Sequence, residues 1–169
     1  SELNTLIASV TDSLEDYEPT KAARAIQGFV NENLSNWYVR LCRRRFWKGD
    51  YAQDKISAYQ TLYTCLETIA VLGSPIAPFF MDRLFTDLNN ITKRSIAESV
   101  HLADLPKTDH NAIDTDLEER MRLAQDITSM VFSLRKKERL RVRQPLQKIM
   151  IPVLSDKVKL QVEAIKDLV

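Results

Sequence analysis

Residues 19–49, PTKAARAIQGFVNENLSNWYVRLCRRRFWKG, carry the pattern that decides the fold. Apolar side chains recur every three or four residues from Ala22 to Leu41, which is the period of one face of an α-helix. Pro19 fits the first turn of a helix, and apart from the tolerable Gly28 no helix breaker intervenes before Gly49. The stretch therefore predicts one long helix, the longest element of the chain.

Similar spacing continues on both sides of this helix. Residues 3–14 and 51–72 each predict a further amphipathic helix. The second of these should end at Gly73 in the manner of a C-cap glycine, and Ser74 and Pro75 have the residue types that begin a fourth helix. Helices joined by such short links indicate an all-α fold, an up-and-down helical bundle.

The pattern changes after the fourth helix. Residues 99–111, SVHLADLPKTDHN, alternate and then break at Pro106, so we expect an extended strap that lies across the bundle. Thr115 and Glu118 have the spacing of a capping box. The apolar positions after them keep helical period, which predicts a fifth long helix.

The last residues predict a short α/β appendage. Ile149, Met150 and Ile151 favour a short strand between two prolines, and residues 158–169 have the period of an amphipathic helix. We expect a helical bundle over residues 1–140 and the truncated start of a following C-terminal segment over residues 141–169. Helical patterns reach both ends, so we expect the chain to be a piece of a longer protein.

Composition narrows the class of protein. The 169 residues include 24 Lys+Arg against 23 Asp+Glu, so the net charge of +1 gives no general attraction to nucleic acid. Only three glycines are present, which argues against a multi-turn β fold and a glycine-rich phosphate loop. No apolar run reaches the ~20 residues of a membrane span, and no signal-peptide pattern opens the chain. We expect a soluble, cytoplasmic protein that does not contact membranes, with Cys42 and Cys65 as free thiols.

The sequence arranges no catalytic or metal-binding motif. The two histidines, His101 and His110, and the two cysteines have unrelated spacings, which argues against a closed zinc site. No metalloprotease, nucleophile-elbow or phosphate-loop signature occurs. We therefore expect neither catalysis nor a metal site in this chain.

Two local basic clusters stand out from the balanced charge. The first contains Arg40, Arg43, Arg44, Arg45 and Lys48. At about 100° per residue, Asn36, Arg40, Arg43 and Trp47 would lie within one narrow arc of the long helix. Such an arc suits RNA, because guanidinium groups bind phosphates and an exposed indole stacks on bases. The alternative is that these arginines only complement the negative end of a helix dipole.

The second cluster lies where the fifth helix should end. Six basic residues occur between Arg135 and Arg143, more than a helix dipole requires. Two basic helix ends could flank one groove, but the spacing leaves their convergence open.

Four stretches resemble one known family. DYEPTKAARAIQGFVNENLSNWYVRLCRRRFW (16–47), LGSPIAPFFMDRLF (72–85), SVHLADLP (99–106) and RVRQPL (141–146) are similar, in wording and order, to the anticodon-binding region of isoleucyl-tRNA synthetases. These are class I aminoacyl-tRNA synthetases. The resemblance covers nearly the whole chain and is closest to the eukaryote-like branch of that family.

The resemblance implies a fragment of a large ligase that uses ATP and Mg²⁺ to join isoleucine to its tRNA. The family's catalytic and editing domains have no counterpart here, so the fragment alone should be inactive and should bind no cofactor. Its expected partners are the anticodon stem-loop of isoleucine tRNA and the remaining domains of the parent enzyme, not DNA. The candidate RNA-binding residues are Asn36, Arg40, Arg43, Arg44, Trp47, Lys48, Arg139, Arg141, Arg143 and Gln144. The alternative function is a helical docking domain within a synthetase complex.

Overall fold

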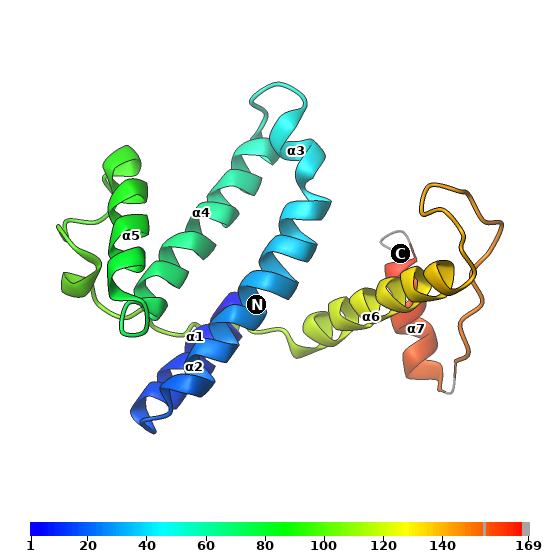
Figure 1. Cartoon of the computed structure of the whole chain (residues 1–169), viewed down its shortest axis with the longest axis horizontal. Coiled ribbons are helices and arrows are strands. Elements are labelled where there is room, and N and C mark those ends of the chain that lie inside the picture. The colour runs from blue at the N-terminus through cyan, green and yellow to red at the C-terminus, as the bar shows by residue number, and fades with distance from the viewer. Residues whose placement is uncertain (154, 167–169) are drawn as a thin grey trace. The chain divides into compact units, whose positions relative to one another are not determined.

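The computed structural model describes residues 1–153 and 155–166, and they form helices and irregular segments without a strand. The elements in chain order are α1 (Glu2–Glu15), α2 (Pro19–Gly28), η1 (Phe29–Val39), α3 (Arg43–Trp47), α4 (Gln53–Gly73), α5 (Pro78–Thr92), η2 (Val100–Leu102), η3 (His110–Ala112), α6 (Thr115–Lys137) and α7 (Asp156–Ile165). Figure 1 labels the α-helices. The all-α prediction is confirmed, and no helix in the described part is long and apolar enough to cross a membrane.

The contacts divide the chain into two units, Glu2–Ile113 and Asp114–Val169 with Ser1. Each unit is described by itself. The predicted division into domains, 1–140 and 141–169, concerns a longer protein and stays a prediction.

The first unit is a set of antiparallel helices around a shared core. Within it, α1 packs on α2, α4 returns along the column formed by α2, η1 and α3, and α5 packs on α4 (Figure 1). The main core contains side chains from α1, α2, η1 and α4, with Val10, Ala22 and Leu72 fully buried. This explains the apolar stripes, since each helix buries one face against its neighbours.

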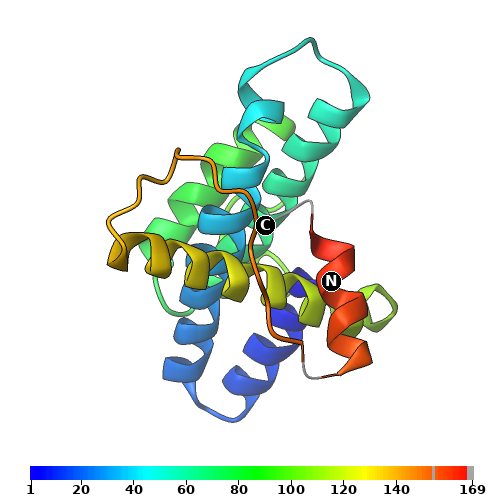
Figure 2. The ribbon, with the colours of Figure 1, turned by 90° about the vertical axis from the view of Figure 1, so that its right-hand side faces the viewer.

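The predicted long helix has the expected extent but is not uniform. Phe29–Val39 forms a π-helix, with hydrogen bonds to the fifth residue along, and the chain bends at Cys42, where φ is −81° and ψ is 1°. Apolar spacing does not report either change, and the predicted stripe is not kept to its end, because Leu41 is 48% exposed. The last helical turns form α3, and the loop after it makes the tip of the hairpin with α4, at the top of Figures 1 and 2.

Gly73 has a different role from the one predicted. α4 ends there, but among the described glycines only Gly49 has a positive φ, at 81°. A Cβ atom at Gly73 would lie 2.7 Å from the Met81 Cε atom, so the missing side chain allows α5 to approach closely. Ser74 and Pro75 do not begin the next helix: the Ser74 hydroxyl donates to the Val71 carbonyl at 2.9 Å, and α5 starts at Pro78.

The strap after α5 is mostly irregular, with the two short 3₁₀ turns η2 and η3. It is fastened to α5 by Asp82, whose Oδ1 atom accepts from the Ser99 hydroxyl at 2.6 Å and from the Val100 N–H at 2.9 Å. Val100 is buried in a second small core with Phe85. The hydrogen bonds from Ser99 and Val100 lower the pKa of the Asp82 carboxyl, since they stabilise its charged form.

The second unit consists mainly of α6 and α7, which pack on each other. The predicted fifth helix is confirmed, but its N-cap is Asp114 rather than Thr115: the Asp114 Oδ1 atom accepts from the Leu117 N–H at 2.9 Å. α7 confirms most of the predicted last helix; Val169 lies outside the described residues.

The predicted strand at Ile149–Ile151 is wrong. This segment has no strand pairing, and the Met150 side chain is 79% exposed. A strand needs a second strand to complete its hydrogen bonds, and none is present among the described residues. The appendage is therefore an irregular segment followed by a helix.

Both cysteines are buried free thiols. Burial raises the pKa of the Cys65 thiol, which favours its uncharged form.

Candidate nucleic-acid interface

The α3 tip exposes three residues of the sequence RRRFW. Arg43, Arg44 and Trp47 are exposed, and Trp47 keeps 79% of its surface accessible. Together with Lys48 they line a shallow hollow of about 310 Å³. This hollow, called the tip site below, combines an indole with three cationic side chains.

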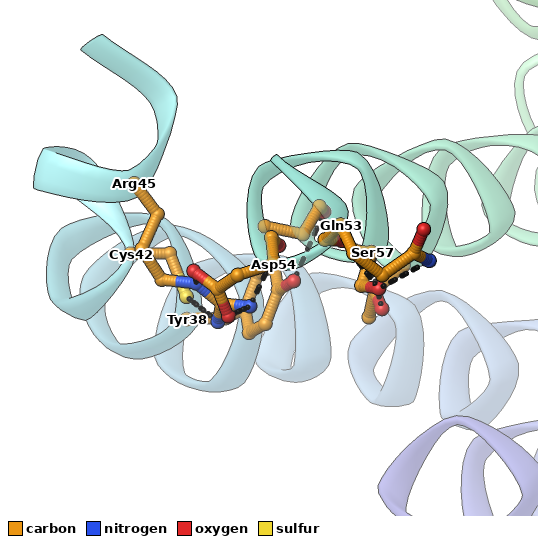
Figure 3. A network of polar contacts seen from close by, with 8 residues as sticks. Tyr38, Cys42, Arg45, Gln53, Asp54 and Ser57 are labelled. Carbon is orange, nitrogen blue, oxygen red and sulfur yellow. Dashed lines mark hydrogen bonds and ion pairs between the residues drawn. The ribbon is translucent and has the colours of Figure 1, made fainter. Parts of the chain in front are cut away.

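The remaining arginine of the run turns inward. The Arg45 Nε and Nη2 atoms donate to the two carboxylate oxygens of Asp54 at 2.8 and 2.7 Å, and Nη2 also donates to the Asp54 carbonyl at 3.0 Å (Figure 3). Its Nη1 atom donates to the Cys42 Sγ atom at 3.4 Å. The hydrogen bond to Asp54, followed by that to Cys42, raises the pKa of the Arg45 guanidinium. Arg45 therefore fastens α3 to the start of α4 and is not a free cation.

Aromatic packing also holds α3 in place. The Phe46 ring lies 6.3 Å from the Tyr38 centroid and 5.1 Å from the Tyr59 centroid, both at tilted angles. The Tyr59 hydroxyl donates to the Phe46 carbonyl at 3.1 Å, and the Tyr38 hydroxyl donates to the Ala58 carbonyl at 3.0 Å. Burial raises the pKa of Tyr38. These contacts give the short α3 a fixed orientation that its five residues could not maintain alone.

The predicted arc of four residues is only partly present. The prediction assumed a constant rotation per residue, but the π-helix and the bend at Cys42 change the phase between Asn36 and Trp47. Asn36 and Arg40 are exposed, but they do not line the tip site. Arg43 and Trp47 do line it.

The second cluster begins with a defined helix end. The Leu140 N–H donates to the Arg135 carbonyl at 2.8 Å and the Arg139 N–H to the Lys136 carbonyl at 3.2 Å, the two bonds of a Schellman motif. Arg139 occupies the position in this motif that glycine favours, with φ at 56°. Its side chain is exposed.

One arginine organises the residues that follow. The Arg135 Nη1 atom donates to the Arg141 carbonyl at 3.0 Å and to the Gln144 carbonyl at 2.9 Å. The Gln144 N–H also donates to the Arg141 carbonyl at 3.0 Å, which closes a turn. As a result Arg141, Arg143 and Gln144 are all exposed on one short, fastened turn.

The structure therefore separates two kinds of residue in these clusters. Arg45 and Arg135 hold backbone or carboxylate oxygens, whereas the predicted site residues are exposed, and of these Arg43, Arg44, Trp47 and Lys48 line the tip site. Convergence of the two clusters in one groove stays a prediction. The sequence analysis did not predict that Arg45 has a structural role. Asp54, an acidic residue soon after the turn at Gly49, could have indicated a partner for one of the arginines.

The described residues contain no group of three or more His, Cys, Asp or Glu that could hold a metal ion.

Comparison with known proteins gives a consistent result. Residues 1–150 match the family model for the anticodon-binding domain of tRNA ligase. The chain is 59% identical over 169 residues to isoleucine–tRNA ligase of Cytophaga hutchinsonii, covering 100% of this chain and 15% of that protein. The corresponding protein of Bacteroides thetaiotaomicron is 59% identical over 169 residues, covering 100% and 14%.

A more distant relative is isoleucine–tRNA ligase of Dehalococcoides mccartyi strain CBDB1, 47% identical over 151 residues, covering 89% of this chain and 15% of that protein. The chain thus spans about 15% of the length of such relatives. All three are bacterial, and closeness to the eukaryote-like branch stays a prediction. The match over most of the chain shows that it belongs to the family of anticodon-binding domains of tRNA ligases.

Proposed function

We propose that this chain is the anticodon-binding part of an isoleucine–tRNA ligase and that it binds the anticodon stem-loop of isoleucine tRNA. The observation that carries the proposal is the 59% identity over all 169 residues to a protein named isoleucine–tRNA ligase. The exposed tip site supports it, because its side chains have the chemistry that RNA loops require.

The tip site would contact both parts of an RNA loop. Unpaired bases stack on aromatic side chains, and the exposed Trp47 indole offers such a surface. Arg43, Arg44 and Lys48 lie beside it and would neutralise the phosphates of the same loop. Asn36 and Arg40, outside the hollow, remain candidates for contacts with the adjoining strand.

The second cluster would contact the RNA backbone. Arg139, Arg141 and Arg143 supply charge, and Gln144 supplies an amide that donates and accepts hydrogen bonds. Because Arg135 fastens the turn, these side chains would lose little backbone entropy on binding.

In the longer protein, the chain would hold the tRNA while other domains join isoleucine to it. ATP and Mg²⁺ supply the activation chemistry there. The chain's own contribution is to bind and orient the RNA, so we expect it to be inactive alone. A cytoplasmic location follows from this role in protein synthesis.

Fluorescence anisotropy with a labelled anticodon stem-loop of isoleucine tRNA tests the proposal. We expect binding that weakens steeply with salt, and a loss of affinity for Trp47→Ala and Arg43→Ala without a change in melting temperature. Arg83→Ala is the matched control, because Arg83 is also exposed but pairs with Asp87 on α5. Weak binding that does not depend on salt would contradict the proposal.

A second function is favoured by one exposed apolar pair. Phe79 and Phe80, on the first turn of α5, are 91% and 67% exposed. Exposed apolar patches mark protein contacts, and aromatic residues are enriched in protein interfaces. The chain could thus also dock to a protein of a synthetase complex. Capture of that partner should survive ribonuclease treatment and should be lost in Phe79→Ser.

A further inference from the structure

A larger hollow lies between α4 and α5, apart from the two predicted clusters. It has a volume of about 800 Å³, within the ~300–1,000 Å³ typical of ligand sites. Its walls include Tyr59, Leu62 and Tyr63 from α4, Leu88 and Thr92 from α5, and Arg94 just beyond α5. We call it the α4/α5 groove. Its lining combines apolar side chains, aromatic rings and one cation.

The polar side of the groove is held in place before any ligand arrives. The Tyr63 and Thr92 hydroxyls lie 2.6 Å apart, which connects α4 to the end of α5. The Arg94 Cζ atom lies 5.1 Å from the centroid of the Tyr63 ring, within cation–π range. Its Nη1 atom also lies 3.8 Å from a Glu67 carboxylate oxygen, a loose pair that leaves the Arg94 side chain 54% exposed.

The backbone that carries Arg94 is also fixed. The Asn89 side chain exchanges two hydrogen bonds with Ser95, one from its Nδ2 atom to the Ser95 carbonyl and one from the Ser95 N–H to its Oδ1 atom, both 2.9 Å. Between them, Lys93 adopts a left-handed conformation with φ at 51°, and its N–H donates to the Asn89 carbonyl at 2.7 Å. The backbone on either side of Arg94 is therefore fixed, and Arg94 is held at one end of the groove.

One side chain of the groove, Tyr59, also contacts α3. Tyr59 lines the groove and is 42% exposed, while its ring contacts Phe46 and its hydroxyl binds the Phe46 carbonyl. Phe46 immediately precedes Trp47 of the tip site, so Tyr59 holds the helix that carries Trp47.

We propose that the α4/α5 groove binds one unpaired nucleotide of the RNA held at the tip site. The base lies against the Tyr59 and Tyr63 rings and the Leu88 side chain, and its phosphate faces Arg94. Base stacking on aromatic rings and on the guanidinium plane is independent of sequence, so the groove holds the RNA without selecting a base. This inference rests on the proposed function, because it requires the chain to bind RNA.

A nucleotide suits the groove better than a protein helix does. A purely apolar groove would favour an amphipathic helix, but this groove has the Arg94 guanidinium at one end and aromatic side chains within it. Stacking platforms beside cationic side chains are the recurring arrangement of proteins that bind single-stranded RNA.

Filling the groove provides the test. Leu88→Trp places an indole in the space that the base would occupy, and Ile91→Trp places the same side chain on the same helix where Ile91 is 85% exposed and outside the groove. We expect Leu88→Trp to weaken binding of the labelled stem-loop by about 5- to 100-fold, the range of one lost stacking contact, and Ile91→Trp to leave it unchanged. Arg94→Gln should weaken binding and lower the salt slope by about 0.7.

The outcomes separate this proposal from the proposed function. If Trp47→Ala weakens binding but a folded Leu88→Trp variant does not, the groove proposal is overturned and RNA binding at the tip stands. If the unsubstituted chain does not bind the stem-loop, both fail.

A second measurement covers the case in which Leu88→Trp unfolds. Stem-loops carrying 4-thiouridine at single loop positions are photo-crosslinked to the unsubstituted chain, and the crosslinked peptides are identified by mass spectrometry. Crosslinks to residues 59–66 or 88–94 from one loop position support the proposal. Crosslinks confined to residues 36–48 overturn it.

Discussion

Arg139 combines an unfavourable backbone conformation with an exposed charge. Its replacement by glycine should change the stability of the chain through the backbone and the RNA affinity through the lost charge, and each effect has its own measurement. Its φ is 56°, a left-handed conformation in which an L-residue other than glycine loses about 1–2 kcal/mol. The main-chain bonds of the Schellman motif, Leu140 N–H to Arg135 at 2.8 Å and Arg139 N–H to Lys136 at 3.2 Å, do not use the side chain. Arg139→Gly should therefore keep the helix end and relieve the backbone.

The expected gain in folding stability of Arg139→Gly is the difference between a backbone gain in the folded state and an entropic loss from the unfolded state. Relief of the left-handed conformation stabilises by about 1–2 kcal/mol, and the greater freedom of glycine in the unfolded chain offsets about 0.4–1 kcal/mol. The net stabilisation is about 0–1.6 kcal/mol, which raises the melting temperature of a chain of this length by up to about 6 °C. RNA affinity should fall at the same time, with the salt slope reduced by about 0.7–0.9 for one lost phosphate contact.

Thermal melting by circular dichroism and anisotropy titrations at several salt concentrations measure both effects. Tyr17→Gly is the matched control: Tyr17 ends α1 with φ at 58° in the same motif, and its side chain is 92% exposed. It should stabilise the chain equally and leave RNA affinity unchanged. A lower melting temperature for Arg139→Gly would refute the backbone argument, and unchanged affinity would remove Arg139 from the interface.

Three further substitutions test the fold around these sites. Leu72→Ala removes a fully buried core side chain and should destabilise the chain by about 2–5 kcal/mol in urea unfolding; a change below about 1 kcal/mol would contradict the assigned core. The pKa of the Asp82 carboxyl is lowered, mainly by the hydrogen bond from Ser99. The charged carboxylate therefore stabilises the fold above the ordinary pKa of aspartate, and this stabilisation is lost as pH falls through the lower pKa of the folded state. Asp82→Asn should remove this acid dependence from thermal melts. Arg45→Lys keeps the charge but not the paired hydrogen bonds, so amide exchange in α3 should accelerate, whereas Arg44→Lys, at an exposed position, should not change it.

Helical period located most of the helices because burial of one face determines both the sequence and the packing. Residues 3–14 predicted α1 nearly to its ends, and residues 51–72 predicted α4. The π-helix at Phe29–Val39 was not predictable in the same way, since apolar spacing indicates which residues are buried and not which hydrogen-bond ladder the backbone forms. The position of α5 was missed because Pro75 and Pro78 both fit a first turn, and only the close contact of Met81 with Gly73 distinguishes them.

The candidate sites were predictable in composition but not in orientation. The sequence RRRFW shows three arginines in a row, yet which of them faces inward depends on the bend at Cys42 and on Asp54, which lies across the hairpin. The α4/α5 groove left no signal, because Tyr63 and Arg94 are far apart in sequence and meet only after α5 folds back along α4.

Both basic clusters resolve the same physical difficulty, which is how to hold several like charges close together on a nearly neutral chain. Repulsion between neighbouring arginines would tend to disorder a short helix or a turn. At the tip Arg45 is bound by Asp54, and in the second cluster Arg135 binds the carbonyls of Arg141 and Gln144. Each cluster thus uses one arginine to fix the backbone on which the exposed ones are placed. Since the inward arginines are already bound, RNA affinity should follow the number of outward arginines, not the number in the sequence.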